Sequence, residues 1–302
     1  MKTSSKNLPL LIAAFAAIYI IWGSTYLAIR LAIESIPPFI MAGSRFVIAG
    51  TILYIVAILT GSAIPVWGEI KRSGLVGFLL LAVGNGSVVW VERTLPSGIA
   101  ALIVTIEPFW VVLITQLITK NKGVTLYTYL GLILGAAGMY ILLGFASGAQ
   151  SLVVDQVSLI ILLLSTLAFA AGSVYSSQAT MPASPMMSTS IQMLVGGGSM
   201  LLLATLRGEW LSVDVNLFTQ KSITAFVYLI FFGSIIGYTA YSWLTTVATP
   251  SQVSTYAYVN PVIAVLLGTF IGGEPLTKEI LIATPVLVLA VSLLIKNPKP
   301  EA

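Results

Sequence analysis

The chain contains neither cysteine nor histidine. Without cysteine it can form no disulfide bond, no thiolate nucleophile and no iron–sulfur ligand set. Without histidine it lacks the usual proton shuttle and the commonest side-chain ligand of transition metals. Serine–histidine proteases and zinc proteases are therefore excluded. We expect no metal and no other cofactor.

Charged residues are also scarce, at 8% of 302 residues, against roughly 25% in a soluble protein. Hydrophobic residues make up 58% of the chain. Such a chain cannot cover itself with polar surface, so we expect the lipid bilayer to be its solvent. The net charge of +4 then reflects basic residues in cytoplasmic loops. We expect no nucleic-acid partner.

The positions of the acidic residues argue against further classes of protein. The aspartates, Asp155 and Asp214, fall at or beyond the ends of apolar stretches, whereas a di-aspartyl protease needs a buried pair. We therefore expect no enzyme. A channel would show rings of charged residues or of carbonyl groups, and no such rings are apparent. A purely structural membrane protein would not need the carboxylate described below.

Ten apolar stretches are predicted to span the membrane: 8–29, 39–60, 74–91, 97–118, 125–145, 157–178, 186–206, 223–245, 251–271 and 279–295. The links between them are short, and most carry prolines, which break helices. The first stretch follows two lysines and resembles a signal peptide, but its apolar run is too long for one. We expect it to be retained.

The basic residues predict the orientation, because they collect in cytoplasmic loops. With the N-terminus inside, the larger group is cytoplasmic: Lys2, Lys6, Lys71, Arg72, Lys120, Lys122, Lys296 and Lys299. The smaller group is outside: Arg30, Arg93, Arg207, Lys221 and Lys278. An even number of spans returns the C-terminus to the cytoplasm. Both termini are therefore predicted to be cytoplasmic.

The fourth stretch carries a charge and a helix breaker at its centre. From Pro96 to Lys120 the sequence holds about 22 uncharged residues apart from Glu107, enough to cross the bilayer. A carboxylate at that depth costs roughly 2.5–3.5 kcal/mol. Pro108 follows and leaves the carbonyl of Val104 without its helical partner. The pattern indicates a functional site. The alternative is a packing kink in which a protonated Glu107 bonds a neighbouring helix.

Two halves of the sequence repeat. Trp22-Gly-Ser-Thr-Tyr26 recurs as Ala171-Gly-Ser-Val-Tyr175, 149 positions later. Glu107-Pro108 recurs as Asn260-Pro261, 153 positions later. We expect residues 1–148 and 149–302 to form two five-helix repeats. Since five is odd, the second repeat must enter the membrane inverted. Inverted repeats are typical of alternating-access transporters.

These motifs resemble those of EamA-type permeases of the drug/metabolite transporter superfamily. The resemblance is carried by I-W-G-S-T-Y, by P-S-G-I-A-A leading to E-P, and by Y-A-Y-V-N-P-V followed by G-G-E. It covers nearly the whole chain. It implies an all-α integral membrane protein with ten transmembrane helices in two inverted five-helix repeats around a central cavity. It also implies the bacterial cytoplasmic membrane as location and export of amino acids or other small metabolites.

Polar and aromatic residues on shared helix faces are the candidate substrate site. Tyr256 shares a face with Asn260, and Trp110 shares one with Glu107. The full set of candidate substrate-binding residues is Glu107, Trp110, Tyr256, Asn260, Trp22, Tyr26, Tyr175, Tyr238 and Tyr241. The candidate helix breaks are Pro108 and Pro261. The alternative for each aromatic residue is that it fills space between helices.

Arg45 is a second charge inside a predicted span. Its depth in the second stretch allows its side chain to reach Glu107 if the two helices adjoin. The matched residues of the second half, Met193 and Asn260, carry no charge, so both charges are absent there together. We expect Arg45 and Glu107 to pair in one state. The alternative is that Arg45 extends to the outer headgroups.

The sequence therefore predicts a secondary transporter that exports a small metabolite, such as an amino acid, by alternating access. Its partners are a small-molecule substrate and lipid, with protons as an open alternative. An uncoupled exchanger and a channel-like facilitator also remain open.

Overall fold

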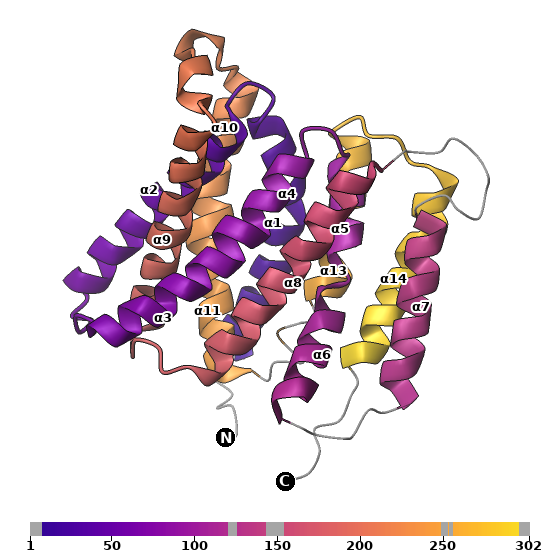
Figure 1. Ribbon diagram of the computed structural model, residues 1–302, viewed down its shortest axis with the longest axis horizontal. Coiled ribbons are helices and arrows are strands. Elements are labelled where there is room, and N and C mark those ends of the chain that lie inside the picture. The colour runs from indigo at the N-terminus through magenta and orange to yellow at the C-terminus, as the bar shows by residue number, and fades with distance from the viewer. Residues whose placement is uncertain (1–7, 120–125, 143–153, 249–252, 254–255, 296–302) are drawn as a thin grey trace.

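A computed structural model describes residues 8–119, 126–142, 154–248, 253 and 256–295. All regular elements within these ranges are helices, and no strand occurs among them. The helices stand side by side in one bundle, with most running between the same two ends (Figure 1). This confirms the all-α membrane fold.

The helices of the first half are α1 (Leu8–Ala32), α2 (Pro38–Leu59), α3 (Trp67–Gly77), the π-helix η2 (Phe78–Asn85), α4 (Gly86–Val91), α5 (Ser97–Val104), α6 (Glu107–Thr119) and α7 (Leu126–Leu142). Those of the second half are α8 (Gln156–Gln178), α9 (Pro185–Leu206), α10 (Gln220–Tyr228), the π-helix η5 (Leu229–Ile236), α11 (Gly237–Val247), α13 (Tyr256–Phe270) and α14 (Lys278–Ile295). Two short 3₁₀ helices, η3 (Glu209–Ser212) and η4 (Val215–Leu217), lie between α9 and α10.

Each of the ten predicted spans coincides with one helix or with a consecutive run of helices. Seven of these segments are long and apolar enough to cross a membrane, and shorter apolar helices lie within α7 and α13. The third span differs most from its prediction, because its helix begins at Trp67. Glu69 accepts a hydrogen bond from the backbone N–H of Val66 at 3.0 Å. This cap stabilises a first helical turn that contains a charged residue. The helix therefore begins before the apolar stretch from which the span was predicted.

The two repeats pack against each other with pseudo-twofold symmetry. Contacts between α2 and α9, between α7 and α14, and between α5 and α13 each join matched helices of the two halves. The other main contacts come in matched pairs. The packing of α1 against α13 corresponds to that of α6 against α8, and the packing of α1 against η5 and α11 corresponds to that of α8 against η2. The sequence repeat is therefore also a structural repeat.

The direction of α2 against α9 shows that the repeats are inverted. A methyl group added at Gly43 would lie 2.9 Å from the carbonyl oxygen of Gly197. One added at Gly50 would lie 3.0 Å from the carbonyl oxygen of Ser190. The contact moves back along α9 as it moves forward along α2, so these matched helices are antiparallel. Glycine at both positions lets the backbones approach this closely.

The bundle has two ends, each marked by the links between its helices. The Pro96 end carries the links 33–37, 92–96 and 207–219, and the Pro182 end carries the links 60–66 and 179–184. The sequence predicts that the Pro96 end faces outside and the Pro182 end the cytoplasm. The expected boundary between the repeats, at 148 and 149, lies outside the described residues.

Aromatic rings and cations close the Pro96 end. Phe39 of α2 stacks on Trp90 of α4, with ring centroids 5.4 Å apart and an interplanar angle of 5°. The guanidinium groups of Arg93 and Arg207 lie 4.1 and 4.0 Å from the centroid of the Trp90 ring. Cation–π contacts of this kind suit the boundary between lipid and water, where one side of a ring is apolar and the other is hydrated.

Candidate functional site

The site begins at the break between α5 and α6. Helix α5 ends at Val104 and α6 begins at Glu107. Between them, Thr105 and Ile106 donate short-range hydrogen bonds to the carbonyls of Leu102 and Ile103, each at 3.2 Å. Pro108 has no N–H to continue the helix. The break therefore places Glu107 in the first turn of α6, where the helix dipole favours a negative charge.

Glu107 is buried, with an exposed fraction of 8%. The hydroxyl group of Tyr256, on α13, lies 3.1 Å from Oε1 and 3.3 Å from Oε2 of Glu107 and donates to the carboxylate. This contact joins the broken helix of the first half to the matched helix of the second half. A solute or a proton that binds Glu107 must compete with this hydroxyl.

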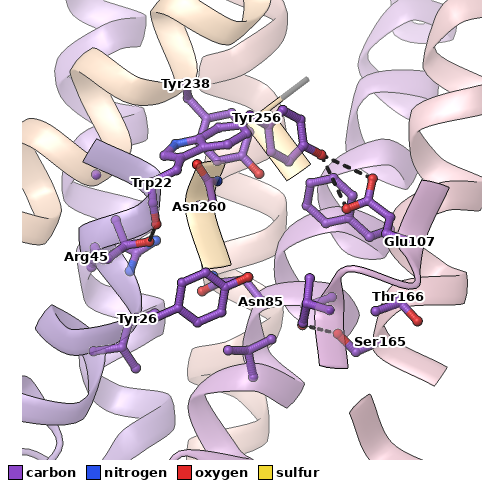
Figure 2. A pocket seen from close by; sticks show the side chains of 17 residues that line it. Trp22, Tyr26, Arg45, Asn85, Glu107, Ser165, Thr166, Tyr238, Tyr256 and Asn260 are labelled. Atoms are coloured by element: carbon purple, nitrogen blue, oxygen red, sulfur yellow. Dashed lines mark hydrogen bonds between the residues drawn. The ribbon is translucent and has the colours of Figure 1, made fainter. Parts of the chain in front are cut away.

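A cavity of about 100 Å³ lies beside this contact (Figure 2). Its walls come from six helical segments of the first half (α1, α2, η2, α4, α5 and α6) and four of the second (α8, η5, α11 and α13). Lining residues with polar or aromatic side chains are Trp22, Thr25, Tyr26, Arg45, Asn85, Glu107, Ser165, Thr166, Phe169, Tyr238, Tyr256 and Asn260. This central cavity contains most of the candidate residues predicted from the sequence.

Trp22 is the centre of an aromatic cluster in the central cavity. Its ring centroid lies 5.3 Å from that of Tyr238, 5.0 Å from that of Tyr241 and 5.3 Å from that of Tyr256. Tilted and edge-on rings at these distances attract each other beyond simple burial. The cluster joins α1, α11 and α13 and forms a rigid apolar wall that also presents hydroxyl groups.

Asn260 ties α13 to α1. With the amide group oriented to satisfy its neighbours, the side-chain nitrogen donates to the carbonyl oxygens of Tyr19 at 3.0 Å and Tyr256 at 3.3 Å. The residue is buried, with an exposed fraction of 6%. A buried amide is costly unless it is hydrogen-bonded. These two bonds explain why Asn260 is tolerated at this depth.

Arg45 does not pair with Glu107 in this structure. Its Nε donates to the hydroxyl group of Ser234, on η5, at 3.0 Å. Its guanidinium carbon lies 4.1 Å from the ring centroid of Phe46. Among the described residues, its Nη1 has no hydrogen-bond partner. The expected ion pair is therefore absent from this conformation, because Ser234 and Tyr256 bind the two groups instead. Arg45 does not extend to the headgroups either, since only 2% of it is exposed.

A second and larger cavity, of about 620 Å³, continues from the central cavity to the Pro182 end. Glu107, Tyr238 and Tyr256 line both cavities. Hydroxyl and amide side chains line the larger cavity further on: Thr115, Ser173, Ser176, Ser177, Gln178, Ser188, Thr189, Gln192 and Ser242. Its other end is formed by the link 179–184. We call it the entry cavity.

Three of the predicted site features differ from the structure. Trp110 lines neither cavity, because its Nε1 donates to Thr166 of α8 at 3.1 Å and its ring packs between helices. Tyr175 also lines neither cavity and is 36% exposed. At Pro261 the helix does not break, since α13 runs from Tyr256 to Phe270 with the proline inside it.

Several cavity residues were not found by sequence reasoning, Asn85 among them. Asn85 and Ser234, which binds Arg45 but lines neither cavity, occupy matched places, each after a glycine and 149 positions apart. Both lie in π-helical segments, η2 and η5. A π-helical turn interrupts the regular hydrogen-bond ladder, and such turns are frequent at functional sites. The repeated Gly-polar pair was the signal that would have found Asn85.

Glu92, directly after α4, is a further buried acid, and sequence reasoning did not find it. It is 0% exposed, and neither of its carboxyl oxygens has a hydrogen-bond partner among the described residues. The guanidinium group of Arg30 donates to its backbone carbonyl rather than to its side chain. Glu92 therefore adds a second carboxyl group beneath the Pro96 end.

Comparison with known proteins identifies the family. The model of the EamA-like transporter family matches residues 9–144 and again 156–296. The chain belongs to this family. The two matches correspond to the two packed halves, and with the apolar helices they make it a multi-pass membrane protein.

Relatives span almost the same length. The chain is 40% identical over 288 residues to an uncharacterized inner membrane transporter, YedA, of Escherichia coli K12, covering 95% of this chain and 90% of that protein. It is 25% identical over 308 residues to an uncharacterized transporter, YvbV, of Bacillus subtilis, covering 100% of this chain and 95% of that protein. A solved crystal structure matches with a TM-score of 0.68 at 16% identity, over 94% of this chain and 96% of the other. That likeness concerns the fold alone.

Proposed function

We propose that the protein is a secondary transporter that exports a small metabolite, such as an amino acid, across the cytoplasmic membrane by alternating access. The observation that carries the proposal is the buried contact between Glu107 and Tyr256, which stands between the central cavity and the entry cavity. It joins matched helices of two inverted repeats. In transporters of this architecture the substrate site lies where such helices meet.

The two ends of the bundle differ in the way that alternating access requires. The entry cavity reaches the Pro182 end, whereas stacked aromatic rings and arginine side chains close the Pro96 end. With the Pro182 end in the cytoplasm, as the basic residues favour, this conformation receives solute from the cytoplasm. Exchange of the conformations of the two repeats would close the Pro182 end and open the Pro96 end.

Export is supported by the family resemblance. The naming of YedA as an inner membrane transporter supports transport across that membrane. Charge distribution supports cytoplasmic termini. Energy would come from a gradient of protons or of a second solute.

Transport in proteoliposomes tests the proposal. Purified protein is reconstituted, and uptake and counterflow are measured for the twenty standard amino acids with and without a pH gradient. We expect saturable transport of at least one solute, accelerated by preloading the same solute inside. Linear flux without saturation would indicate a channel, and saturable exchange that ignores the pH gradient would indicate an uncoupled exchanger.

A further inference from the structure

Arg45 is a buried cation whose hydrogen bonds are incomplete. It donates through Nε to Ser234 and lies on the ring of Phe46, but Nη1 has no partner among the described residues. A guanidinium group offers five N–H donors. Buried charges are normally paired or fully hydrogen-bonded, because an unpaired one is costly in a membrane interior.

The described carboxylates do not supply the missing partner. Glu107 lines the same cavity, but Tyr256 donates to both of its oxygens. Glu92 is buried nearby, yet it forms no ion pair with Arg45. The ion pair found among the described residues is that of Lys221 with Glu34 at the surface.

Packing alone does not require an arginine here. The repeat places Met193 at the position that matches Arg45, 148 residues later. Met193 is fully buried, with an exposed fraction of 0%. It lies in α9 and packs against Gly50 of α2, the matched helix of the first half. An uncharged side chain therefore serves the same place in the other repeat. The charge of Arg45 needs a different reason.

The central cavity has charges of opposite sign on opposite walls. In Figure 2, Arg45 lies on one side of the drawn cavity and Glu107 on the other, with Trp22, Asn260 and Tyr256 between them. The two charges sum to zero when both groups are ionised. A phosphate dianion bound at Arg45 would be repelled by Glu107, whereas a monocarboxylate with a cationic group elsewhere would complement both walls.

We propose that Arg45 is the anion subsite of the central cavity and binds a carboxylate group of the transported solute. This rests on the proposed function. Ser234 holds Nε of the guanidinium group, and the remaining N–H groups form charge-assisted hydrogen bonds with the solute's carboxylate. Helix α2 supplies the arginine and η5 supplies the serine, so both repeats contribute to the subsite.

The test compares each amino acid with its carboxamide, which replaces the carboxylate by a neutral group of similar size. Both series are measured as counterflow in the same proteoliposomes. We expect wild-type protein to prefer the acids over their amides by about tenfold or more. Arg45→Gln should abolish this preference, and Arg45→Lys should retain part of it, since lysine keeps the charge but loses the planar fork. Lys221→Gln, which removes a cation of the exposed pair with Glu34 outside both cavities, is the control and should keep the wild-type preference.

The outcomes separate the two proposals. Transport of amides as fast as acids by wild-type protein would overturn the role of Arg45 and leave the transporter proposal standing, and this comparison needs no variant to fold. An equal loss of transport for acids and amides in Arg45→Gln, with the wild-type preference for acids retained, would mean that the arginine has only a structural role. Transport of no solute in either series by folded wild-type protein would overturn both proposals.

Discussion

Glu274 is expected to hold the Pro96 end closed. It lies in the link between α13 and α14 and reaches the start of α5. Its Oε1 accepts from the backbone N–H of Ser97 at 2.7 Å, and its Oε2 accepts from that of Gly98 at 3.0 Å. The first N–H groups of a helix have no partner within the helix and carry partial positive charge. A carboxylate of the second repeat therefore caps a helix of the first repeat.

Glu209 makes a similar contact at the same end, because it also caps the start of a helix of the first repeat. Its Oε2 accepts from the backbone N–H groups of Phe39 and Ile40 at 3.0 and 3.1 Å, at the start of α2. In the sequence repeat, Gly208-Glu209 corresponds to Gly61-Ser62 at the Pro182 end. Both glycines have positive φ, 70° and 81°. At the Pro182 end, however, the neutral hydroxyl group of Ser62 takes the place of the Glu209 carboxylate.

The perturbation is Glu274→Gln, which keeps the shape of the side chain but replaces one acceptor oxygen by an NH₂ group. A hydrogen bond to a charged group contributes about 1.5–3 kcal/mol. Because Glu274 is only partly buried, solvent screens its charge. We therefore expect Glu274→Gln to lower the free energy that favours the closed end by about 2 kcal/mol. This corresponds to roughly a 30-fold shift in the ratio of closed to open Pro96 ends.

The assay uses the absence of native cysteine. A cysteine replaces Val88, which lines the central cavity and is 6% exposed. A membrane-impermeant maleimide is added from the Pro96 side, and its labelling rate reports how often that end opens. We expect Glu274→Gln to raise the rate by roughly 30-fold.

Glu34→Gln is the matched control, because Glu34 is a carboxylate at the same end in a solvent-exposed pair with Lys221. Exposed pairs of this kind contribute little, so its rate should not change. An unchanged labelling rate in Glu274→Gln would refute the view that this carboxylate closes the end.

Three other predictions use the same preparations. Glu107→Gln should remove any dependence of transport on the pH gradient, as measured by counterflow at two pH values. Tyr256→Phe, which removes the hydroxyl that binds Glu107, should change the KM for solute several-fold, whereas Tyr175→Phe should not. Burial raises the pKa of Glu209 against the opposing effect of its hydrogen bonds, so the closed end binds a proton more tightly than the open end. Because the maleimide reacts with the thiolate, the labelling rate at position 88 is compared with that of Glu209→Gln at the same pH. Relative to Glu209→Gln, labelling should slow as the pH falls toward that raised pKa and recover as it rises.

The sequence was sufficient to predict the helices and their inversion, because both depend on properties that a single chain displays. Apolar length determines which segments can span lipid, and an odd number of spans per repeat determines the inversion. The contacts of Gly43 with Gly197 and of Gly50 with Ser190, which show that α2 and α9 are antiparallel, confirm the result. The substrate-binding roles of the candidate residues stay predictions.

Side-chain direction was predictable only in part. Helical spacing placed Trp110 beside Glu107 and Tyr256 beside Asn260, yet Tyr256 contacts Glu107, whereas Trp110 donates to Thr166. Spacing fixes the face of a helix but not the neighbour that the face meets. The π-helical turns rotate later residues by an amount that spacing does not predict, which is why Asn85 was missed.

The two prolines show how the same covalent change leads to different structures. Pro108 and Pro261 each remove one backbone hydrogen bond, but the helix breaks only before Pro108. Near that break, the hydroxyl group of Thr105 donates to the carbonyl of Leu102 at 2.6 Å and so competes with the helical ladder. The matched residue of the other half is a tyrosine, and the amide of Asn260 instead ties α13 to α1. The first repeat therefore has an interrupted helix, broken just before Glu107, whereas the matched helix α13 of the second repeat is continuous. A change in the bonding of Glu107 can act on α6 without disturbing α5, whereas a change at Asn260 must move α13 together with α1.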